Sequence, residues 1–386
     1  MVRLGISGLL LLLSLGACSE IQVPVGDSDG GLDGDATAGP DAMVSDCAIG
    51  AICDVVANYA FVTSTLQAPG DLGGLGGADA LCKMRAAAAG LPDTGYVAWL
   101  SNTNTNAGDR LLNGSGWIRT DKRPFALSKE DLLAGNIVYP LHLDEFGNAI
   151  STLPDVVTGT DAMGVQTTDG DCEDWTKKDA GMSASAGIAV SASIDWTIGP
   201  ATIPCSRGTR IYCLGTGVTR TLTIPEVDGR VAWISSGKAQ GNAGQAALHG
   251  LCEDDVLAEP GRLNGVAQAL IAIQGTTAAE LFDLSQATWV RPDGVVLWEK
   301  AEDMATSSPL APIRLRLDGA PTTSMQVWTG AANQSMMPGP EDNCGNWQLT
   351  NSKANIGQPS SVGNLFFKLP QKQDCDTALP VYCLED

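Results

Sequence analysis

Two similar series of apolar and polar segments follow one another along the chain. Each opens with a short apolar segment typical of a buried β-strand, at residues 59–63 and again at 231–234. A loop rich in Gly and Asn comes next, and a helical stretch follows it. The first helix is predicted over residues 78–89, because its alanines favour a helix and Gly90 and Pro92 favour its end.

Long loops fill much of what remains in each series. Short strands are predicted between these loops, for example at residues 96–100 and 211–214. Several glycines lie just before the first predicted helix. Their spacing does not match GxGxxG and no Lys-Ser/Thr follows, so we interpret them as a flexible loop and not as a phosphate site. These glycines are Gly70, Gly73, Gly74, Gly76 and Gly77.

The cysteines repeat in the same way. Two sets of four are displaced by about 170 residues, and the last two cysteines of each set are separated by seven residues. In an exported chain such sets predict disulfides, although four cysteines allow three pairings that spacing cannot decide. Cys47 and Cys53 form a short extra pair, and Cys18 stands alone. The sets are Cys82, Cys172, Cys205 and Cys213, and Cys252, Cys344, Cys375 and Cys383.

Residues beside the cysteines also recur. We therefore expect a short segment at 47–57, a first domain at 58–216, a linker at 217–226 and a second domain at 227–386. The recurring motifs are Ile211-Tyr212-Cys213-Leu214 with Val381-Tyr382-Cys383-Leu384, Asp171-Cys172-Glu173-Asp174-Trp175 with Asn343-Cys344-Gly345-Asn346-Trp347, and Trp117-Ile118-Arg119 with Trp289-Val290-Arg291.

The N-terminus has the features of a bacterial secretion signal. Arg3 is followed by an apolar run too short to span a bilayer, and Leu15-Gly16-Ala17-Cys18 resembles the lipobox of bacterial lipoproteins. Residues 1–18 are therefore predicted to be a lipoprotein signal with Cys18 as the lipidated residue. The alternative is an ordinary signal peptide with a chance cysteine. Residues 19–46 are acidic and rich in Gly and Ala, which predicts a flexible tether.

The charge of the chain narrows the choice of partners. The 386 residues carry a formal net charge of −21, so we expect no binding to nucleic acid. No later segment is long and apolar enough to cross a membrane, which leaves the N-terminal lipid as the expected contact with it.

The repeated motifs resemble the C-type-lectin-like superfold, in particular its endostatin-like branch and a domain family found in bacterial surface lipoproteins. The resemblance includes the strand Ala98-Trp99-Leu100, a Thr-Gly turn, Cys-x-x-Trp, and Cys-x7-Cys with Tyr before the last Cys. The second copy matches more loosely, since Ala269-Leu270-Ile271 replaces the first of these motifs. The resemblance implies an α+β fold of two tandem disulfide-stapled domains. It also implies the pairs Cys82–Cys213, Cys172–Cys205, Cys252–Cys383 and Cys344–Cys375, beside Cys47–Cys53.

The calcium and sugar motifs of sugar-binding C-type lectins are missing. Neither copy has Glu-Pro-Asn or Gln-Pro-Asp in its long loop, or Trp-Asn-Asp before its third cysteine, so standard calcium-dependent sugar binding is not expected. A speculative calcium site is predicted at the acidic cluster around Cys172, because calcium prefers several carboxylate oxygens. The alternative is a solvated acidic loop. The cluster is Asp169, Asp171, Glu173 and Asp174.

Enzyme chemistry finds little support in the residues. The two histidines, His142 and His249, do not recur between the copies, and no nucleophile motif accompanies them. His142 with Asp144 and Glu145 is either a weak metal pair or a surface turn. Since all domain cysteines have structural partners, an oxidase with reactive thiols is not expected. We predict no catalytic activity and no cofactor apart from the speculative calcium.

The tryptophans are open to two interpretations, a core role or a stacking platform for sugar rings. Trp117 with Trp289, and Trp175 with Trp347, recur at matching positions and are predicted to lie in the core. Trp196 and Trp298 have no matching partner and are predicted to contribute to a surface specific to one copy.

The function expected from these observations is non-catalytic ligand binding or adhesion. The chain is predicted to be lipid-anchored to the outer membrane, facing the periplasm or the outside, and to present two C-type-lectin-like domains to a glycan or protein ligand. The alternatives are a secreted enzyme on the same scaffold and a purely structural envelope protein.

Overall fold

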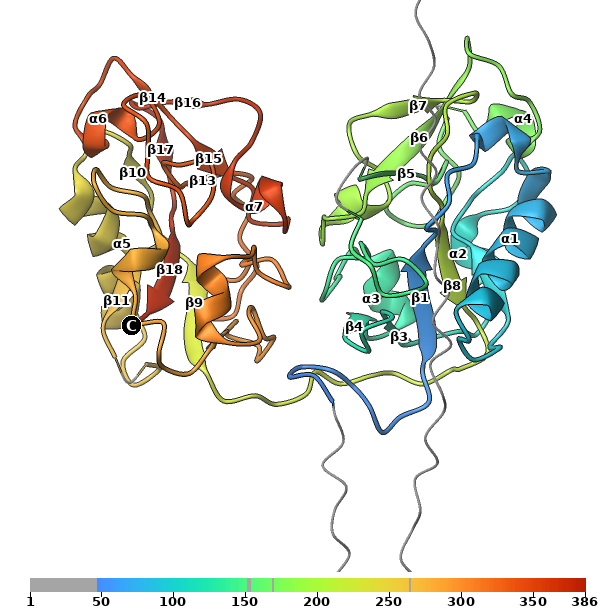
Figure 1. Ribbon diagram of the computed structural model, residues 1–386, viewed down its shortest axis with the longest axis horizontal. Helices are drawn as coiled ribbons and strands as arrows, with labels where there is room; N and C mark the ends of the chain where they lie inside the picture. The colour runs from blue at the N-terminus through green and yellow to red at the C-terminus, as the bar shows by residue number, and fades with distance from the viewer. Residues whose placement is uncertain (1–46, 151–153, 169, 264) are drawn as a thin grey trace, which may run out of the picture. The chain divides into compact units, whose positions relative to one another are not determined.

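The computed structural model describes residues 47–386 except 151–153, 169 and 264 (Figure 1). The predicted signal, Cys18 and the tether lie outside the described residues. Within them the chain is a mixed α+β protein that belongs to one compact unit. Equivalent elements occur in residues 58–216 and 227–386, which we call the first and second repeat.

The main sheet of the first repeat has five strands in the order β2-β8-β1-β3-β4. Its first and last strands, β1 and β8, pair antiparallel at the centre, and β3 runs parallel to β1. Helix α1 packs against β2, and the disulfide Cys82–Cys213 joins this helix to β8. The elements are β1 (Asn58–Val62), α1 (Gly74–Ala88), β2 (Tyr96–Ala98), β3 (Trp117–Ile118), β4 (Pro124–Ala126) and β8 (Tyr212–Gly215).

The second repeat contains the same arrangement. Its main sheet has the order β11-β18-β9-β12, again with a parallel pair, β9 and β12, beside the central antiparallel pair. Helix α5 packs against β11 and is joined to β18 by Cys252–Cys383. The elements are β9 (Arg230–Ile234), α5 (Gln245–Ala258), β11 (Ala267–Ala269), β12 (Trp289–Val290) and β18 (Tyr382–Glu385).

Smaller sheets form the other end of each repeat. In the first repeat, β5, β6 and β7 form one three-stranded sheet. In the second repeat the strands at this end are shorter and form separate two-stranded pairs. The strands are β5 (Asp155–Val157), β6 (Ser183–Ile188), β7 (Thr202–Pro204), β10 (Ala239–Gln240), β13 (Val327–Trp328), β14 (Lys353–Ala354), β15 (Ile356–Gly357), β16 (Gln373–Asp374) and β17 (Ala378–Leu379).

Short helical turns lie in the long connections between the strands. Two of them, α4 and α6, follow the second cysteine of each repeat and are described with the site below. The short turns are η1 (Pro69–Asp71), α2 (Ala107–Arg110), α3 (Lys129–Leu133), α4 (Cys172–Trp175), η2 (Ile194–Trp196), η3 (Ala279–Leu281), η4 (Ala301–Ala305), α6 (Cys344–Trp347) and α7 (Asn364–Phe367).

Helix α1 begins earlier than the sequence pattern predicts. It starts at Gly74, so several of the glycines that we expected in a flexible loop lie in its first turn. Gly77 is needed there, because a Cβ at this position would lie 2.0 Å from the backbone oxygen of Leu72. The glycines therefore let the helix start close against the preceding backbone, and the prediction of a flexible loop over Gly74–Gly77 is wrong.

The tryptophans form the core. All nine have an exposed fraction of 1% or less, including Trp99 and the predicted core pairs. The prediction that Trp196 and Trp298 contribute to a surface is wrong. The Trp196 ring lies 5.1 Å from the Trp99 ring, and the Trp298 ring lies 5.9 Å from that of Trp289. Both side chains fill space between the sheets and the long connections.

Five disulfides fasten this core. They join Cys47 to Cys53, Cys82 to Cys213, Cys172 to Cys205, Cys252 to Cys383 and Cys344 to Cys375. The last four are the pairs that the resemblance implies. The Cys47–Cys53 segment is not isolated, since Ile52 packs with Ala57, Ile118 and Leu222.

Removal of a long-loop disulfide should destabilise the protein more than removal of the short one. The chain-entropy model gives about 5 kcal/mol for Cys82–Cys213, which spans 131 residues, and about 2 kcal/mol for Cys47–Cys53, which spans 6. Urea unfolding of Cys82→Ala/Cys213→Ala and Cys47→Ala/Cys53→Ala checks this order. Equal losses, or a larger loss for the short pair, would contradict it.

Candidate functional site

A left-handed turn begins at the second cysteine of each repeat. The φ angles of its four residues are 56°, 50°, 56° and 67° in Cys172–Trp175, and 55°, 56°, 60° and 65° in Cys344–Trp347. The turn closes like one turn of an α-helix of opposite hand, because the Trp175 N–H donates to the Asp171 carbonyl at 2.7 Å. This region costs a non-glycine residue about 1–2 kcal/mol, so the surrounding structure must hold the turn.

The side chain before the turn provides the first support. The Asp171 carboxylate accepts a hydrogen bond from the Asp174 N–H at 3.1 Å in the first repeat. Asn343 does the same in the second repeat, where its Oδ1 accepts from the Asn346 N–H at 2.9 Å. Asp and Asn thus support one backbone geometry in the two repeats.

The third residue of the turn provides the second support. The Asp174 carboxylate accepts from the Thr103 N–H at 3.0 Å, and the Asn346 Oδ1 accepts from the Gln274 N–H at 2.9 Å. Thr103 and Gln274 occupy equivalent loops after β2 and β11. The turn is therefore tied to a loop that is distant in the sequence in both repeats.

A buried tryptophan ring completes the support. Trp175 donates its indole N–H to the Ser101 carbonyl at 2.8 Å, and Trp347 donates to the Ala272 carbonyl at 3.0 Å. A glycine lies against each ring, because a Cβ at Gly330 would lie 2.5 Å from a carbon of the Trp347 ring. The equivalent distance at Gly159 is 2.6 Å. The glycine of the Thr-Gly motif seen in the sequence thus packs against the tryptophan ring in each repeat.

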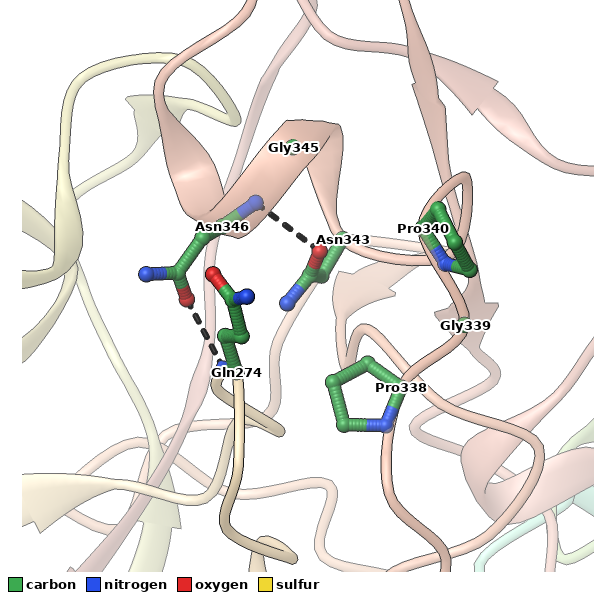
Figure 2. Close-up of a pocket in the computed structure, with 7 residues that line it drawn as sticks. All are labelled: Gln274, Pro338, Gly339, Pro340, Asn343, Gly345 and Asn346. Atoms are coloured by element: carbon green, nitrogen blue, oxygen red, sulfur yellow. Dashed lines mark hydrogen bonds between the residues drawn. The ribbon is translucent and has the colours of Figure 1, made fainter.

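A cavity of about 310 Å³ lies beside the turn of the second repeat (Figure 2). Gln274, Asn343 and Asn346 line it together with Pro338 and Pro340, and backbone of two glycines completes the wall. Figure 2 shows the Gln274 side chain reaching between Asn343 and Asn346, with the two prolines to the other side of Asn343. The loop after β11 and the left-handed turn thus bring three amide side chains together.

The cavity is polar and uncharged. None of its seven lining residues titrates. The side chains differ in exposure, since Asn343 is buried, Asn346 is half-buried and Gln274 is exposed. The arrangement can donate and accept hydrogen bonds, but it holds no group that could act as an acid, a base or a nucleophile.

The predicted calcium residues occupy the equivalent turn of the first repeat. Asp171 is buried and supports the turn, and Glu173 forms an ion pair with Lys177 at 2.7 Å. The hydrogen bond from the Thr103 backbone holds the pKa of Asp174 below its usual value. Among the described residues no three His, Cys, Asp or Glu side chains are placed to hold a metal ion. Asp169 lies outside the described residues, so calcium binding at this cluster stays a prediction.

The histidines have separate structural surroundings. Burial lowers the pKa of His142 to about 3, with a further contribution from the Arg119 charge, and its Nδ1 lies 3.1 Å from the Pro140 carbonyl. His249 accepts a hydrogen bond from the Ala269 N–H at 3.1 Å, and burial lowers its pKa as well. Both imidazoles are therefore neutral near pH 7.

The carboxylates near His142 also have partners. Asp144 accepts hydrogen bonds from the Phe146 and Asn148 N–H groups, both at 2.9 Å, in a tight turn. Glu145 is buried and pairs with Arg85. The expected turn is present, but these two carboxylates are buried in it and do not lie on a surface.

The comparisons with known proteins do not identify the chain, since neither a protein-family model nor a curated protein matches it. Within the described part of the chain, no helix has both the length and the apolar character needed to cross a membrane.

The amide cavity was not predicted from the sequence. Its signal was present in the repeated motif, where Asn343, Gly345 and Asn346 stand in place of Asp171, Glu173 and Asp174. The motif indicated a shared scaffold, but Gln274 and the prolines could not be assigned to the same place before the loops were positioned.

Replacement of Gly330 should show how much the close contact between this glycine and the Trp347 ring contributes to the free energy of unfolding. Gly330→Ala adds a clash with Trp347, so we expect a loss of about 3–5 kcal/mol from strained backbone and overpacking together. Gly275→Ala is the matched control, since Gly275 has the same φ of 82° but no atom within 4 Å of the added Cβ. Its loss should stay at about 1–2 kcal/mol. Equal losses in urea unfolding would show that the ring contact contributes nothing.

The lowered pKa of His142 makes a pH-dependent contribution to stability. The unfolded chain binds a proton near pH 6.5 and the folded chain only near pH 3, so this contribution is present above pH 6.5 and is lost as the pH falls toward 3. A His142→Asn variant should reduce the dependence of unfolding free energy on pH by up to about 1.4 kcal/mol per pH unit. An NMR titration of the imidazole with a midpoint near 6.5 would contradict the assignment.

Proposed function

We propose that the protein is a lipid-anchored envelope protein whose two C-type-lectin-like repeats bind a ligand without catalysis. The observation that carries the proposal is the cavity of the second repeat, where three amides converge beside a strained but well-supported turn. Strained backbone clusters at ligand sites when the rest of the fold maintains it. The site can recognise a ligand through hydrogen bonds and has no titrating group of its own.

The C-type-lectin-like assignment is supported by features that both repeats share. In each one the first strand pairs antiparallel with the last, and the first helix is disulfide-bonded to that last strand. A second disulfide fastens the long connection at the left-handed turn. Long loops on such a stapled core are suited to binding, because they vary without loss of the scaffold.

The location rests on the N-terminal sequence. The lipobox-like motif at Cys18 supports lipidation, and Cys18 is the cysteine left over from the five disulfides of the described residues. The acidic stretch after it would carry the repeats away from the outer membrane, on its periplasmic or external side.

The alternative of a secreted enzyme is less well supported. His142 and His249 lie in different repeats, and each has a lowered pKa and a backbone partner. A purely structural envelope protein would not need a preformed amide-lined cavity.

A screen of the 46–386 fragment on glycan and protein arrays, with and without calcium, tests the function. We expect saturable binding that is weakened by Gln274→Ala, with Gln348→Ala as the control for an exposed glutamine outside the cavity lining. Binding that is insensitive to Gln274 would separate the function from this cavity. Turnover of a hydrolase or oxidase substrate that is lost in His142→Asn or His249→Asn would overturn the non-catalytic assignment.

A further inference from the structure

We propose that the cavity of the second repeat takes an uncharged, hydroxyl-rich ligand of sugar size, and that it does so without a metal ion. This inference rests on the proposed binding function and names the chemical class of its ligand. Asn346 and Gln274 supply the hydrogen-bonding groups, while Asn343, whose amide is engaged with the Asn346 N–H and the Ala272 carbonyl, keeps the cavity wall uncharged.

The electrostatics of the cavity favour a neutral ligand. The lining holds no charged residue that could compensate an ionised ligand. Two carboxylates adjoin lining residues in the sequence: Asp342 is engaged with the Gly339 N–H at 2.8 Å and with Lys372 at 2.9 Å, and Glu341 is exposed to solvent. Since a charge that is removed from water needs a partner, a neutral ligand fits this site better than an ion.

Two of the amides in the cavity have hydrogen-bonding groups that the fold does not use. Asn346 uses its Oδ1 to accept from the backbone of Gln274 and from the side chain of Gln245. Within the described residues its Nδ2 donates to no group, and the Gln274 amide has no side-chain hydrogen bond. The site thus offers both donors and an acceptor. A hydroxyl group, which can donate and accept at once, satisfies such a set.

The size and shape of the cavity suit a small polyol. A volume of about 310 Å³ lies at the lower end of the range for small-molecule sites. Pro338 and Pro340 add apolar C–H surface, which suits the carbon skeleton of a polyol. No side chain larger than proline or glutamine lines the cavity, so it contains no apolar pocket for the anchor residue of a peptide.

The first repeat supplies the comparison that assigns specificity. Its turn makes the same two supporting hydrogen bonds with Asp171 and Asp174 in place of Asn343 and Asn346. The backbone geometry is therefore independent of the exchange, whereas the donors and the neutrality of the site depend on it. The exchange of amides for carboxylates changes the chemistry of the turn without changing its shape.

The double variant Asn343→Asp/Asn346→Asp tests the inference in the 46–386 fragment, whose residues form one compact unit. The probes are neutral saccharides (maltose, cellobiose, lactose and diacetylchitobiose) followed by ligand-detected NMR, and an insoluble glucan in pull-down distinguishes free sugar from polymer. We expect the wild type to bind at least one probe in EDTA. The double variant should bind it at least about tenfold more weakly, which is 1.4 kcal/mol.

A matched control and a fold control accompany this variant. Asp171→Asn/Asp174→Asn makes the opposite exchange in the first repeat and should leave saccharide binding unchanged, because that repeat has Thr103 in the place of Gln274 and the prolines of the cavity belong to the second repeat. The melting temperature and the buried environment of Trp347 are the fold control for the Asp variant, because aspartate at position 343 loses the hydrogen bond that Asn343 donates to the Ala272 carbonyl at 3.4 Å. The single variant Asn346→Asp leaves that hydrogen bond in place and should weaken saccharide binding in the same direction.

The outcomes separate the inference from the proposed function. Unchanged binding in the Asn343→Asp/Asn346→Asp variant, loss of binding in EDTA, or binding only of charged probes would overturn the inference. Peptide binding at Gln274 with no saccharide binding would also overturn it, but would keep the proposed function. Absence of any ligand on the saccharide panel and on both arrays would overturn both.

Discussion

The left-handed turn that begins at the second cysteine of each repeat is the constraint on which the site depends. Four successive residues with positive φ oppose folding by several kcal/mol, at about 1–2 kcal/mol for each non-glycine residue. A side-chain cap, a bond to a distant loop, a disulfide and a buried indole all act on these four residues. Each support also fixes a neighbour, so the turn determines where Gln274 meets Asn343 and Asn346.

The two repeats share this frame and differ in how the space around it is filled. Trp99 in the first repeat corresponds to Leu270 in the second, since both follow the alanine paired with the last cysteine. Trp298, another buried ring, supplies aromatic volume to the second core, where it contacts Trp289 and Phe366. Both cores thus bury their aromatic rings, but the largest side chains stand at different positions in the two repeats. The turns differ as well, since that of the first repeat is acidic and that of the second is lined by amides.

Sequence reasoning was most successful where the pattern is local or written twice. The strands predicted at 59–63 and 231–234 correspond to β1 and β9, and each lies within one residue of its observed bounds. A short apolar segment between two loop segments is a specific signal for a buried strand. The start of α1 was missed, because glycine disfavours helices in isolation and the close approach to Leu72 is a tertiary effect.

The site was harder to predict for a physical reason. Cys-x-x-Trp is compatible with an ordinary helix, and nothing local shows that its backbone is left-handed. Trp196 and Trp298 seemed unmatched because alignment compares identities. Trp196 packs against Tyr212, the tyrosine before the last cysteine of the first repeat. In the second repeat the equivalent tyrosine, Tyr382, packs instead against Phe366, with the two rings 4.6 Å apart. Long-range packing therefore decided both the core and the cavity.

The left-handed conformation of both turns is what positions the site. NMR cross-correlated relaxation and HN–Hα couplings report the sign of φ for each residue of Cys172–Trp175 and Cys344–Trp347 in solution. We expect positive φ at all eight residues, with one conformation for each turn. Negative φ within either turn, or exchange between the two hands, would contradict it.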